Sequence, residues 1–312
     1  MTRNLKALAD NQFDVLVIGG GILGAGIARD AALRGLKVAL VDKADFASGT
    51  SSRSTKLIHG GFRYLEQGAF GLVAESCRER AILQRNAPHL VKPVPFLFAV
   101  YEGDVRPLWK MRFGMTLYDW LALYRNTASH QTLSVAATLM KEPHLRRAGL
   151  RGAVQFYDCQ EDDARFCLDN ILHAAELGAV CANYCEVTGL VRQGDRVVAA
   201  KTADFDIRAN WLVNATGPWI NRLSPQVRLS PTKGVHLLLA HRSERGIFWQ
   251  ARDGRLVFVV PWFDCTILGA TDTDFTGDAA EAHADECDRE YLLSEFSDRK
   301  STRLNSSHSS VS

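Results

Sequence analysis

Two spacings of hydrophobic positions alternate at the start of the chain. Residues 14–19 (DVLVIG) form a continuous apolar run, which is typical of a strand buried on both faces of a parallel sheet. A glycine-rich turn follows, then helical spacing over residues 22–33 that ends at Gly35, and a second apolar run over residues 38–41. This order predicts a strand–helix–strand unit of about 30 residues.

Further along, the pattern predicts mainly helices and then closely spaced strands. Pro93 and Pro95 are expected to break the chain before a strand, and Tyr157 to begin a polar connection. Helices are predicted over residues 70–85, 107–125, 161–178 and 282–296. Strands are predicted over residues 96–101, 180–187, 196–202, 211–214, 235–240, 256–260 and 265–268. The later strands follow one another as in an antiparallel sheet, so a nucleotide-binding domain interleaved with an antiparallel domain is expected.

Composition excludes several classes of protein. Of the 312 residues, 46% are hydrophobic and 23% are charged, which excludes a disordered chain, a collagen and a small disulfide scaffold. A net charge of +2 gives no sign of nucleic-acid binding. The seven cysteines include no C-x-x-C pair, so we expect buried, reduced thiols of a cytosolic protein rather than a metal site or disulfides. Neither a signal peptide nor a membrane-spanning run is predicted.

The glycine-rich turn carries the first candidate chemistry. Gly19, Gly21 and Gly24 fit the pattern G-x-G-x-x-G between the predicted strand and helix. The first glycine permits the tight turn, the second lets the backbone approach a pyrophosphate, and the third lets helix and strand pack closely. Asp42 ends the next strand, where a carboxylate accepts hydrogen bonds from a ribose. The motif predicts a dinucleotide site, and by itself it leaves NAD(P) and FAD open.

Five later blocks resemble one protein family. The blocks are residues 49–66 (GTSSRSTKLIHGGFRYLE), 156–170, 212–219, 233–237 and 257–274. In this order they closely resemble the FAD-dependent glycerol-3-phosphate dehydrogenases of the aerobic respiratory chain, which are glycine/D-amino-acid oxidase-like flavoproteins. The resemblance implies an α/β fold in which an FAD-binding Rossmann-like domain (residues 12–90 and 156–222) is interleaved with an antiparallel-sheet substrate domain (91–155 and 223–297).

The resemblance also implies a reaction and a location. sn-Glycerol 3-phosphate is oxidised at C2 to dihydroxyacetone phosphate, hydride passes to N5 of FAD, and quinone takes the electrons in glycerol catabolism. Such an enzyme is cytoplasmic, with peripheral contact to the cytoplasmic face of the inner membrane. Alternatives are a related amino-acid or amine oxidase, an inert fragment or binding module, and an NAD-dependent dehydrogenase, which would leave residues 49–66 without a role.

Carried over residue by residue, the resemblance gives a candidate site. Arg63 is a candidate for the substrate phosphate, with Tyr64 beside it, and His59 and His236 compete for the role of catalytic base. Thr271 and Asp272 are expected on the substrate side, where an acid orients a base or caps a turn. The remaining residues are expected to bind FAD: Thr50, Ser51, Ser52, Gly60, Gly61, Val187, Thr216 and Gly217.

Two segments remain to be explained. Residues 106–125 mix aromatic and basic side chains, as an interfacial membrane helix does, but their apolar positions go nearly all round, which favours packing within the protein. Residues 298–308 (DRKSTRLNSSH) resemble a translated sequencing adapter, so residues 298–312 are expected to be a non-native tail; a natural Ser-rich disordered tail is the alternative. Family members continue with a further substrate-side Arg, a Gly-Gly-Lys loop and a helical domain, so this chain is expected to bind FAD poorly and turn over little.

Overall fold

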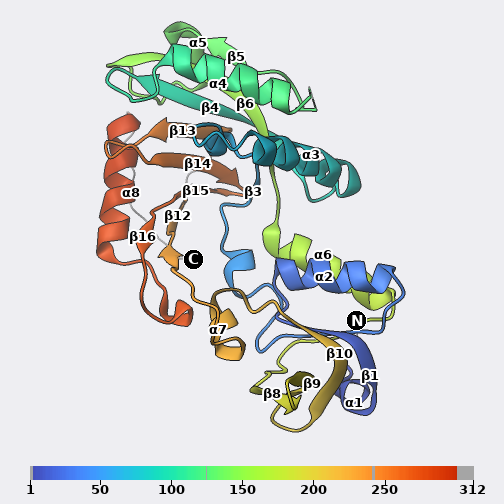
Figure 1. Cartoon of the computed structure of the whole chain (residues 1–312). Helices are drawn as coiled ribbons and strands as arrows, with labels where there is room; N and C mark the ends of the chain where they lie inside the picture. The colour runs from blue at the N-terminus through green and yellow to red at the C-terminus, as the bar shows by residue number, and fades with distance from the viewer. Residues whose placement is uncertain (1–2, 124, 241–242, 301–312) are drawn as a thin grey trace. The chain divides into compact units, whose positions relative to one another are not determined.

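The computed structural model describes residues 3–123, 125–240 and 243–300, apart from the side chain of Arg63. The chain divides into two compact units, each built from two separate segments (Figure 1). The first unit comprises Met1–Ser54 and Asp162–Pro231, and the second comprises Thr55–Glu161 and Thr232–Ser312. The chain therefore first leaves the first unit after Ser54, not near residue 90 as the sequence suggested. The reason is that Val73 and Cys77 of the following helix pack into the core of the second unit.

A six-stranded sheet forms the centre of the first unit, in the order β7-β2-β1-β10-β9-β8. The first four strands of this order, β7 to β10, pair in parallel with one another. Strand β9 is antiparallel to β10, and β8 is antiparallel to β9. These strands are β1 (Gln12–Ile18), β2 (Val38–Val41), β7 (Val180–Ala182), β8 (Gly189–Gln193), β9 (Arg196–Lys201) and β10 (Asp206–Asn214). The helices are α1 (Leu5–Asp10), α2 (Ile22–Leu33), α6 (Asp163–Glu176) and α7 (Ile220–Leu223). The predicted strand–helix–strand unit is thus β1-α2-β2.

Alanines let the two long helices of this unit lie close to its sheet. Ala25, Ala28 and Ala32 of α2 are buried in one cluster with Cys167 and Ile171 of α6, and the two helices lie side by side in Figure 1. The side chain of Asp162 caps α6 by accepting from the Arg165 N–H at 3.0 Å. The strand predicted over residues 180–187 is too long, because it ends at Ala182. Beyond it the Cys185 N–H donates to the Asp42 carbonyl at 2.8 Å, outside any strand.

The second unit is built on a larger, mostly antiparallel sheet, in the order β12-β15-β14-β13-β4-β6-β3, with β5 also paired to β6. Its strands are β3 (Leu57–Ile58), β4 (Lys92–Tyr101), β5 (Gln131–Leu133), β6 (Leu150–Gln160), β12 (His236–Leu239), β13 (Gly246–Gln250), β14 (Leu256–Trp262) and β15 (Cys265–Gly269). A separate pair joins β11 (Thr232–Lys233) to β16 (Thr273–Asp274). The helices are α3 (Phe70–Asn86), α4 (Leu108–Leu121), α5 (Val135–Lys141) and α8 (Glu286–Arg299).

Two strands of this sheet correct the prediction. Tyr157 does not begin a polar connection: it lies inside β6, whose eleven residues pair with β4 along most of their length. Pro93 and Pro95 do not interrupt the chain before β4 but belong to it. Strand β4 pairs with its second neighbour, β13, only from Phe96 to Phe98. The strand tolerates the prolines because their missing N–H groups remove no hydrogen bond between β4 and β13.

Helix α4 buries only one of its faces among the described residues. Met111, Met115 and Tyr118 are buried in the core of the second unit. Trp109, Phe113 and Trp120 are 73%, 69% and 61% exposed. Packing on all sides, the interpretation preferred from the sequence, is therefore wrong for these three aromatic side chains. No helix of the described segments is both long and apolar enough to cross a membrane.

Helix α8 continues past the point where the native chain was expected to end. It ends at Arg299, three residues after the buried Phe296 and therefore on the same face. The Arg299 guanidinium donates to the Gln250 carbonyl at 3.0 Å, and Lys300 pairs with Glu142 at 3.5 Å. Residues 298–300 thus pack with the second unit, and residues 301–312 lie outside the described residues. The non-native origin of residues 298–312 stays a prediction.

Five of the seven cysteines are buried, whereas Cys265 is half-buried and Cys287 is exposed, which corrects the expectation that all are buried. Burial raises the pKa of Cys159 to about 11 and that of Cys181 to about 12. Both thiols therefore keep their protons at neutral pH, as inert core groups do.

The N-terminus of α8 gives a prediction about acid stability. Asp285 caps the helix in a capping box with Asp288 and pairs with Lys233 at 2.8 Å. The hydrogen bond from Lys233, with that from the Asp288 backbone, lowers the pKa of Asp285 to about 2. This stabilisation is present above the unfolded value of 3.8 and is lost as pH falls toward 2. We expect Asp285→Ala to lower the melting temperature by about 2–4 °C at pH 7. The difference should shrink toward pH 2 in thermal scans; an equal difference at both pH values would contradict the assignment.

Candidate functional site

The predicted glycine loop lies between β1 and α2 and is tightly packed. Gly19 has φ +111°, and a Cβ there would overlap the carbonyl of Ala215. A Cβ on Gly24 would overlap the carbonyl of Gly19, so this helix turn rests directly on the backbone of the loop. These two positions require glycine for the reasons that a dinucleotide turn requires it: a positive φ and close contact between helix and strand.

A second loop brings hydroxyl groups to the N-terminus of α2. Residues Thr50–Ser52 form a short 3-10 helix, and Ser51 Oγ accepts a hydrogen bond from the Ile22 N–H at 2.9 Å. A Cβ on Gly21 would lie 3.0 Å from the same Ser51 oxygen. Thr50 is exposed, whereas Ser51 and Ser52 are half-buried. The structure therefore brings Gly21 and Ser51 together at a helix N-terminus, where N–H groups and the helix dipole favour an anion.

Asp42 holds the glycine loop in place. Its Oδ2 accepts from the Gly20 N–H at 2.6 Å, and its Oδ1 accepts from the Ala44 N–H at 2.8 Å. Both carboxylate oxygens thus bind backbone, and each keeps a lone pair for a further donor such as a ribose hydroxyl.

A third loop lies beside the first, after β10. The Ala215 N–H donates to the Ile18 carbonyl at 2.8 Å, and the Thr216 hydroxyl donates to Asn214 Oδ1 at 2.7 Å. Gly217 has φ +57° with open space where a Cβ would point. Val187 is half-buried in the apolar cluster on the same sheet, in the segment between β7 and β8. Three loops thus meet where the parallel strands end, the usual ligand position in open α/β sheets.

In the second unit, the predicted HGG loop follows the short strand β3. Gly61 has φ +73°, and its N–H donates to His59 Nδ1 at 3.0 Å. A backbone N–H only donates, so Nδ1 must supply a lone pair, and the neutral His59 ring carries its proton on Nε2. His59 is exposed and Gly60 is buried. His59 is therefore arranged as a hydrogen-bond donor at Nε2.

His236 lies in a different setting of the same unit. It is 7% exposed at the start of β12, and its Nε2 lies 3.0 Å from the hydroxyl of Thr55, two residues before β3. Thr271 is buried, and its hydroxyl accepts from the Val235 N–H at 3.0 Å, so it holds the residue before His236. Asp272 is exposed, and its carbonyl accepts from Arg255 at 3.3 Å. The structure brings Thr55, His236 and Thr271 together.

The residues after the HGG loop are described only in part. Arg63 belongs to a 3-10 helix, Phe62–Leu65, and its side chain lies outside the described residues. The ring of Tyr64 is half-buried and lies over Gly61, at 2.5 Å from the position a Cβ would take there. The role expected of Arg63 in binding phosphate thus stays a prediction.

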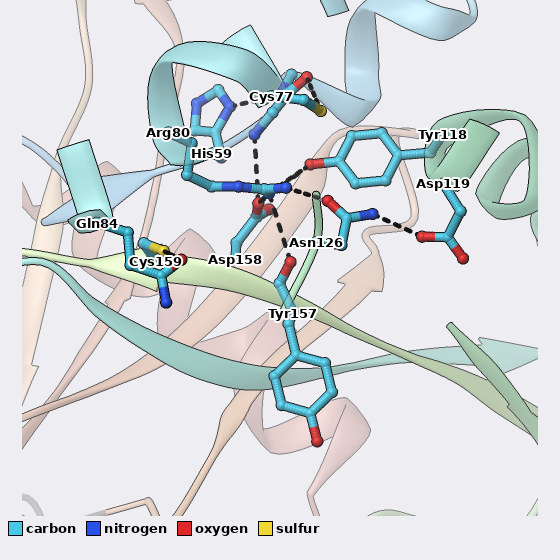
Figure 2. Close-up of polar contacts among 12 residues, drawn as sticks. His59, Cys77, Arg80, Gln84, Tyr118, Asp119, Asn126, Tyr157, Asp158 and Cys159 are labelled. Atoms are coloured by element: carbon cyan, nitrogen blue, oxygen red, sulfur yellow. Dashed lines mark hydrogen bonds and ion pairs between the residues drawn. The ribbon is translucent and has the colours of Figure 1, made fainter. Parts of the chain in front are cut away.

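A buried polar cluster that was not predicted from the sequence lies under the HGG loop. Arg80 of α3 pairs with Asp158 of β6, and Tyr118 and Asn126 bind the same guanidinium (Figure 2). One signal was available: Val73, Cys77 and Arg80 share one face of α3, which places an arginine on an otherwise apolar stripe. Nothing in the spacing of the sequence pointed to Asp158 as its partner.

Comparison with known proteins decides the family. Residues 14–303 match the family described as FAD dependent oxidoreductase. This chain belongs to that family. The chain is 42% identical to a glycerol-3-phosphate dehydrogenase of Mycobacterium leprae over 303 residues, which cover 90% of this chain and 51% of the relative. It is 38% identical to an alpha-glycerophosphate oxidase of Streptococcus pneumoniae over 93% of this chain and 51% of the relative.

Solved structures agree with the fold class predicted from the sequence. The chain resembles the FAD complex of glycerol-3-phosphate dehydrogenase from Bacillus halodurans with a TM-score of 0.77 and 33% identity, over 96% of this chain and 55% of that one. Glycine oxidase from Bacillus cereus shares the fold at a TM-score of 0.66 and 21% identity. The glycine/D-amino-acid oxidase-like fold is thus confirmed. The chain spans about half the length of the curated relatives it matches.

The family's cofactor is FAD, and the first unit fits it. Side chains are absent at Gly19, Gly21 and Gly24, where a Cβ would fill the loop or press on its neighbours. Hydroxyl and backbone N–H groups surround the same turn, as a pyrophosphate needs. The FAD prediction is therefore confirmed at the level of the family, and the individual contacts remain to be tested.

Proposed function

We propose that this oxidoreductase oxidises sn-glycerol 3-phosphate at C2 to dihydroxyacetone phosphate, with FAD as cofactor. The observation that carries the proposal is the meeting of three loops at the N-terminus of α2, in a chain 42% identical to a protein named glycerol-3-phosphate dehydrogenase. Bound FAD would supply the acceptor for the hydride that leaves C2. The other tasks, which are binding the phosphate and taking the hydroxyl proton, belong to side chains of the protein.

The first unit would hold FAD through the backbone and side-chain groups around its glycine loop. Gly19, Gly21 and Gly24 would let the pyrophosphate approach the backbone, and Asp42 would accept from the ribose. The hydroxyl-bearing loop (Thr50, Ser51 and Ser52) would donate to phosphate or flavin oxygens without adding charge. Val187 would lie along the adenine. Thr216 and Gly217 would line the other side of the dinucleotide. The approach of Gly60 and Gly61 to the isoalloxazine stays a prediction from the family resemblance.

His236 is our choice for the base that takes the C2 hydroxyl proton. A general base must lie within about 2.6–3.2 Å of the hydroxyl that it deprotonates. His236 Nε2 already has a hydroxyl, that of Thr55, at 3.0 Å, and its ring is buried. Thr271 supports this position through Val235. Asp272 is exposed on the same segment, and we place it at the edge of the substrate site.

His59 and Arg63 would bind rather than deprotonate the substrate. His59 accepts at Nδ1 from the Gly61 N–H, so its neutral ring offers Nε2–H as a donor and has no lone pair there for a proton. Arg63 would pair with the phosphate through its permanently charged, forked guanidinium. Tyr64, next along the chain, would add a hydroxyl donor.

The test is a visible absorption spectrum before and after anaerobic sn-glycerol 3-phosphate. It is recorded for this chain and for a chimera that continues it with the C-terminal half of the Mycobacterium leprae relative, both loaded with FAD. Loss of the oxidised-flavin band with sn-glycerol 3-phosphate, but not with glycine or proline, supports the proposal. Bleaching by an amino acid instead would indicate an amino-acid oxidase. A chimera that holds FAD and bleaches with neither substrate contradicts the proposal.

We also propose that quinone takes the electrons and that helix α4 contacts the membrane. The exposed Trp109, Phe113 and Trp120 lie on a helix that also carries Lys110 and Arg112, and aromatic and basic side chains together suit a lipid headgroup region. Such contact would bring a cytoplasmic enzyme to the inner membrane, where quinone resides.

Membrane contact gives a direct prediction. We expect the double variant W109S/W120S to lose most of its binding to vesicles of anionic lipid in a flotation assay. The physical reason is that each tryptophan would bury apolar area in the lipid interface worth about 1.5–3 kcal/mol, and serine does not. The matched control is Trp211→Ser, because Trp211 is 74% exposed on a strand of the first unit. Equal flotation of parent and double variant would contradict the role of α4.

A further inference from the structure

The buried ion pair between Arg80 and Asp158 has no role in the proposed reaction so far. Arg80 is 3% exposed on a helix face shared with Val73 and Cys77, and Asp158 is 4% exposed on β6. Buried ion pairs add little net stability compared with apolar residues of the same size. The pair therefore calls for an explanation other than stability.

Several hydrogen-bond acceptors surround the guanidinium of Arg80 (Figure 2). Its Nη1 donates to Asp158 Oδ1, to the Tyr118 hydroxyl at 2.8 Å and to the Tyr157 carbonyl at 3.4 Å, and its Nη2 donates to Asn126 Oδ1. A planar fork with several donors suits such a set, and a lysine ammonium does not. Arg80 thereby ties α3, β6 and the residues after α4 together.

The far side of the cluster fixes the orientation of Asn126. Its Nδ2 donates to Asp119 Oδ1 at 2.6 Å, and Asp119 Oδ2 accepts from the His130 N–H at 2.9 Å. Because the amide nitrogen faces Asp119, the amide oxygen must face Arg80. Burial and the Asp158 carboxylate also raise the pKa of Tyr118 well above its ordinary value, so its hydroxyl keeps the proton that it donates to Asp158 at 3.1 Å.

The near side of the cluster holds the peptide of Gly60. Asp158 Oδ1 accepts from the Gly60 N–H at 3.2 Å, and Cys77 Sγ lies 3.8 Å from the Gly60 carbonyl as a donor. A Cβ on Gly60 would overlap both the Tyr118 hydroxyl and the Cys77 sulfur. The next N–H along the chain, that of Gly61, is the one that donates to His59 Nδ1 at 3.0 Å. The cluster and the imidazole are thus joined through a single dipeptide.

We propose that Arg80 and Asp158 are positioning residues: they fix the Gly60–Gly61 backbone and thereby hold His59 in the tautomer that carries its proton on Nε2. Asp158 supplies the acceptor for the Gly60 N–H. The Arg80 guanidinium orients the buried Asp158 carboxylate and neutralises its charge. The importance of that tautomer for the substrate rests on the proposed function, but the arrangement itself does not. Replacing the pair by apolar groups should leave a folded protein whose His59 is no longer fixed.

Two double variants separate positioning from stability. R80M/D158N and R80M/D158L both remove the buried charges. The asparagine keeps an oxygen that can accept from the Gly60 N–H, and the leucine does not. The matched single control is Arg78→Met, because Arg78 is exposed on the same helix. Far-UV circular dichroism and thermal scans report folding.

The readout is nitrogen NMR of protein labelled at histidine, at about pH 8.5, where ordinary histidines are neutral. His59→Gln assigns the resonances. In the parent, R78M and R80M/D158N we expect Nδ1 to show the resonance of an unprotonated nitrogen and Nε2 that of a protonated one. In R80M/D158L we expect the two resonances to move toward each other as both tautomers become populated. His59 resonances that stay unchanged in a folded R80M/D158L, or that move equally in both double variants, overturn the proposal.

If R80M/D158L does not fold, the single variant Tyr118→Phe tests the proposal instead. Tyr118→Phe removes one hydroxyl that both donates to Asp158 and accepts from Arg80. A smaller movement of the same His59 resonances supports the proposal, and no movement overturns it. None of these spectra requires FAD or substrate. An enzyme that fails to oxidise sn-glycerol 3-phosphate while its His59 spectrum behaves as expected would therefore contradict the proposed function alone.

Discussion

Replacing Gly24 by valine should abolish measurable FAD binding and destabilise the first unit. A Cβ at this position overlaps the carbonyl oxygen of Gly19, which is backbone and cannot rotate away. The α2 N-terminus and the glycine loop must therefore move apart, and the N–H groups that would face the pyrophosphate move with them. Losing two charge-assisted hydrogen bonds of about 1.5–3 kcal/mol each corresponds to an affinity loss of at least about 100-fold. Overpacking adds about 1–3 kcal/mol of destabilisation.

The matched control lies two residues further along the same helix. Gly26 is exposed, and open space surrounds the position of its missing Cβ. Alanine there should leave FAD affinity unchanged and should raise stability by up to about 1 kcal/mol, because alanine favours a helix interior over glycine. Flavin fluorescence titration gives the affinities, and thermal scans give the stabilities. If Gly24→Val bound FAD like the parent, the glycine loop would not be the FAD site.

Contiguous signals explain why the first unit could be predicted from sequence. The segments β1, α2 and β2 follow each other within 30 residues, and each carries its own periodicity. A glycine with positive φ follows β1 and α2: Gly19 with φ +111° and Gly35 with φ +80°. Strand β6 could not be predicted in this way. Its polar Tyr157 and Asp158 make it read as a connection, and only Arg80, 78 positions away in sequence from Asp158, turns that polarity into a buried pair.

The same contrast between local motifs and contacts of distant residues applies to the candidate site. The glycine loop was predicted from its motif and the hydroxyl loop from the family resemblance, and the structure brings Gly21 and Ser51 together. The choice between His59 and His236 could not be made from sequence, because it depends on which group faces each ring nitrogen. For His59 that group is a backbone N–H, and for His236 it is the hydroxyl of Thr55. Such contacts are set by loop conformation and by strand order, which no motif specifies.

His236 should therefore matter far more to turnover than His59. In the chimera completed with the relative's C-terminal half, we expect His236→Gln to lower kcat by about 10²–10⁴-fold, the usual contribution of a general base. Glutamine keeps a polar group near Thr55, so the loss reports the missing base rather than a collapsed site. The acid limb of the pH–rate profile, which a histidine base produces, should vanish together with the activity.

His59→Gln is the matched comparison, since the same substitution is made at the other histidine. A donor that binds the substrate equally in the ground and transition states affects KM and not kcat. Glutamine can still donate, so we expect KM to rise by up to about 10-fold while kcat and the acid limb of the profile are retained. Stopped-flow measurement of flavin reduction separates the two parameters. Equal, mild losses in both variants would remove both histidines from the role of base, and a large kcat loss confined to His59→Gln would reverse the assignment.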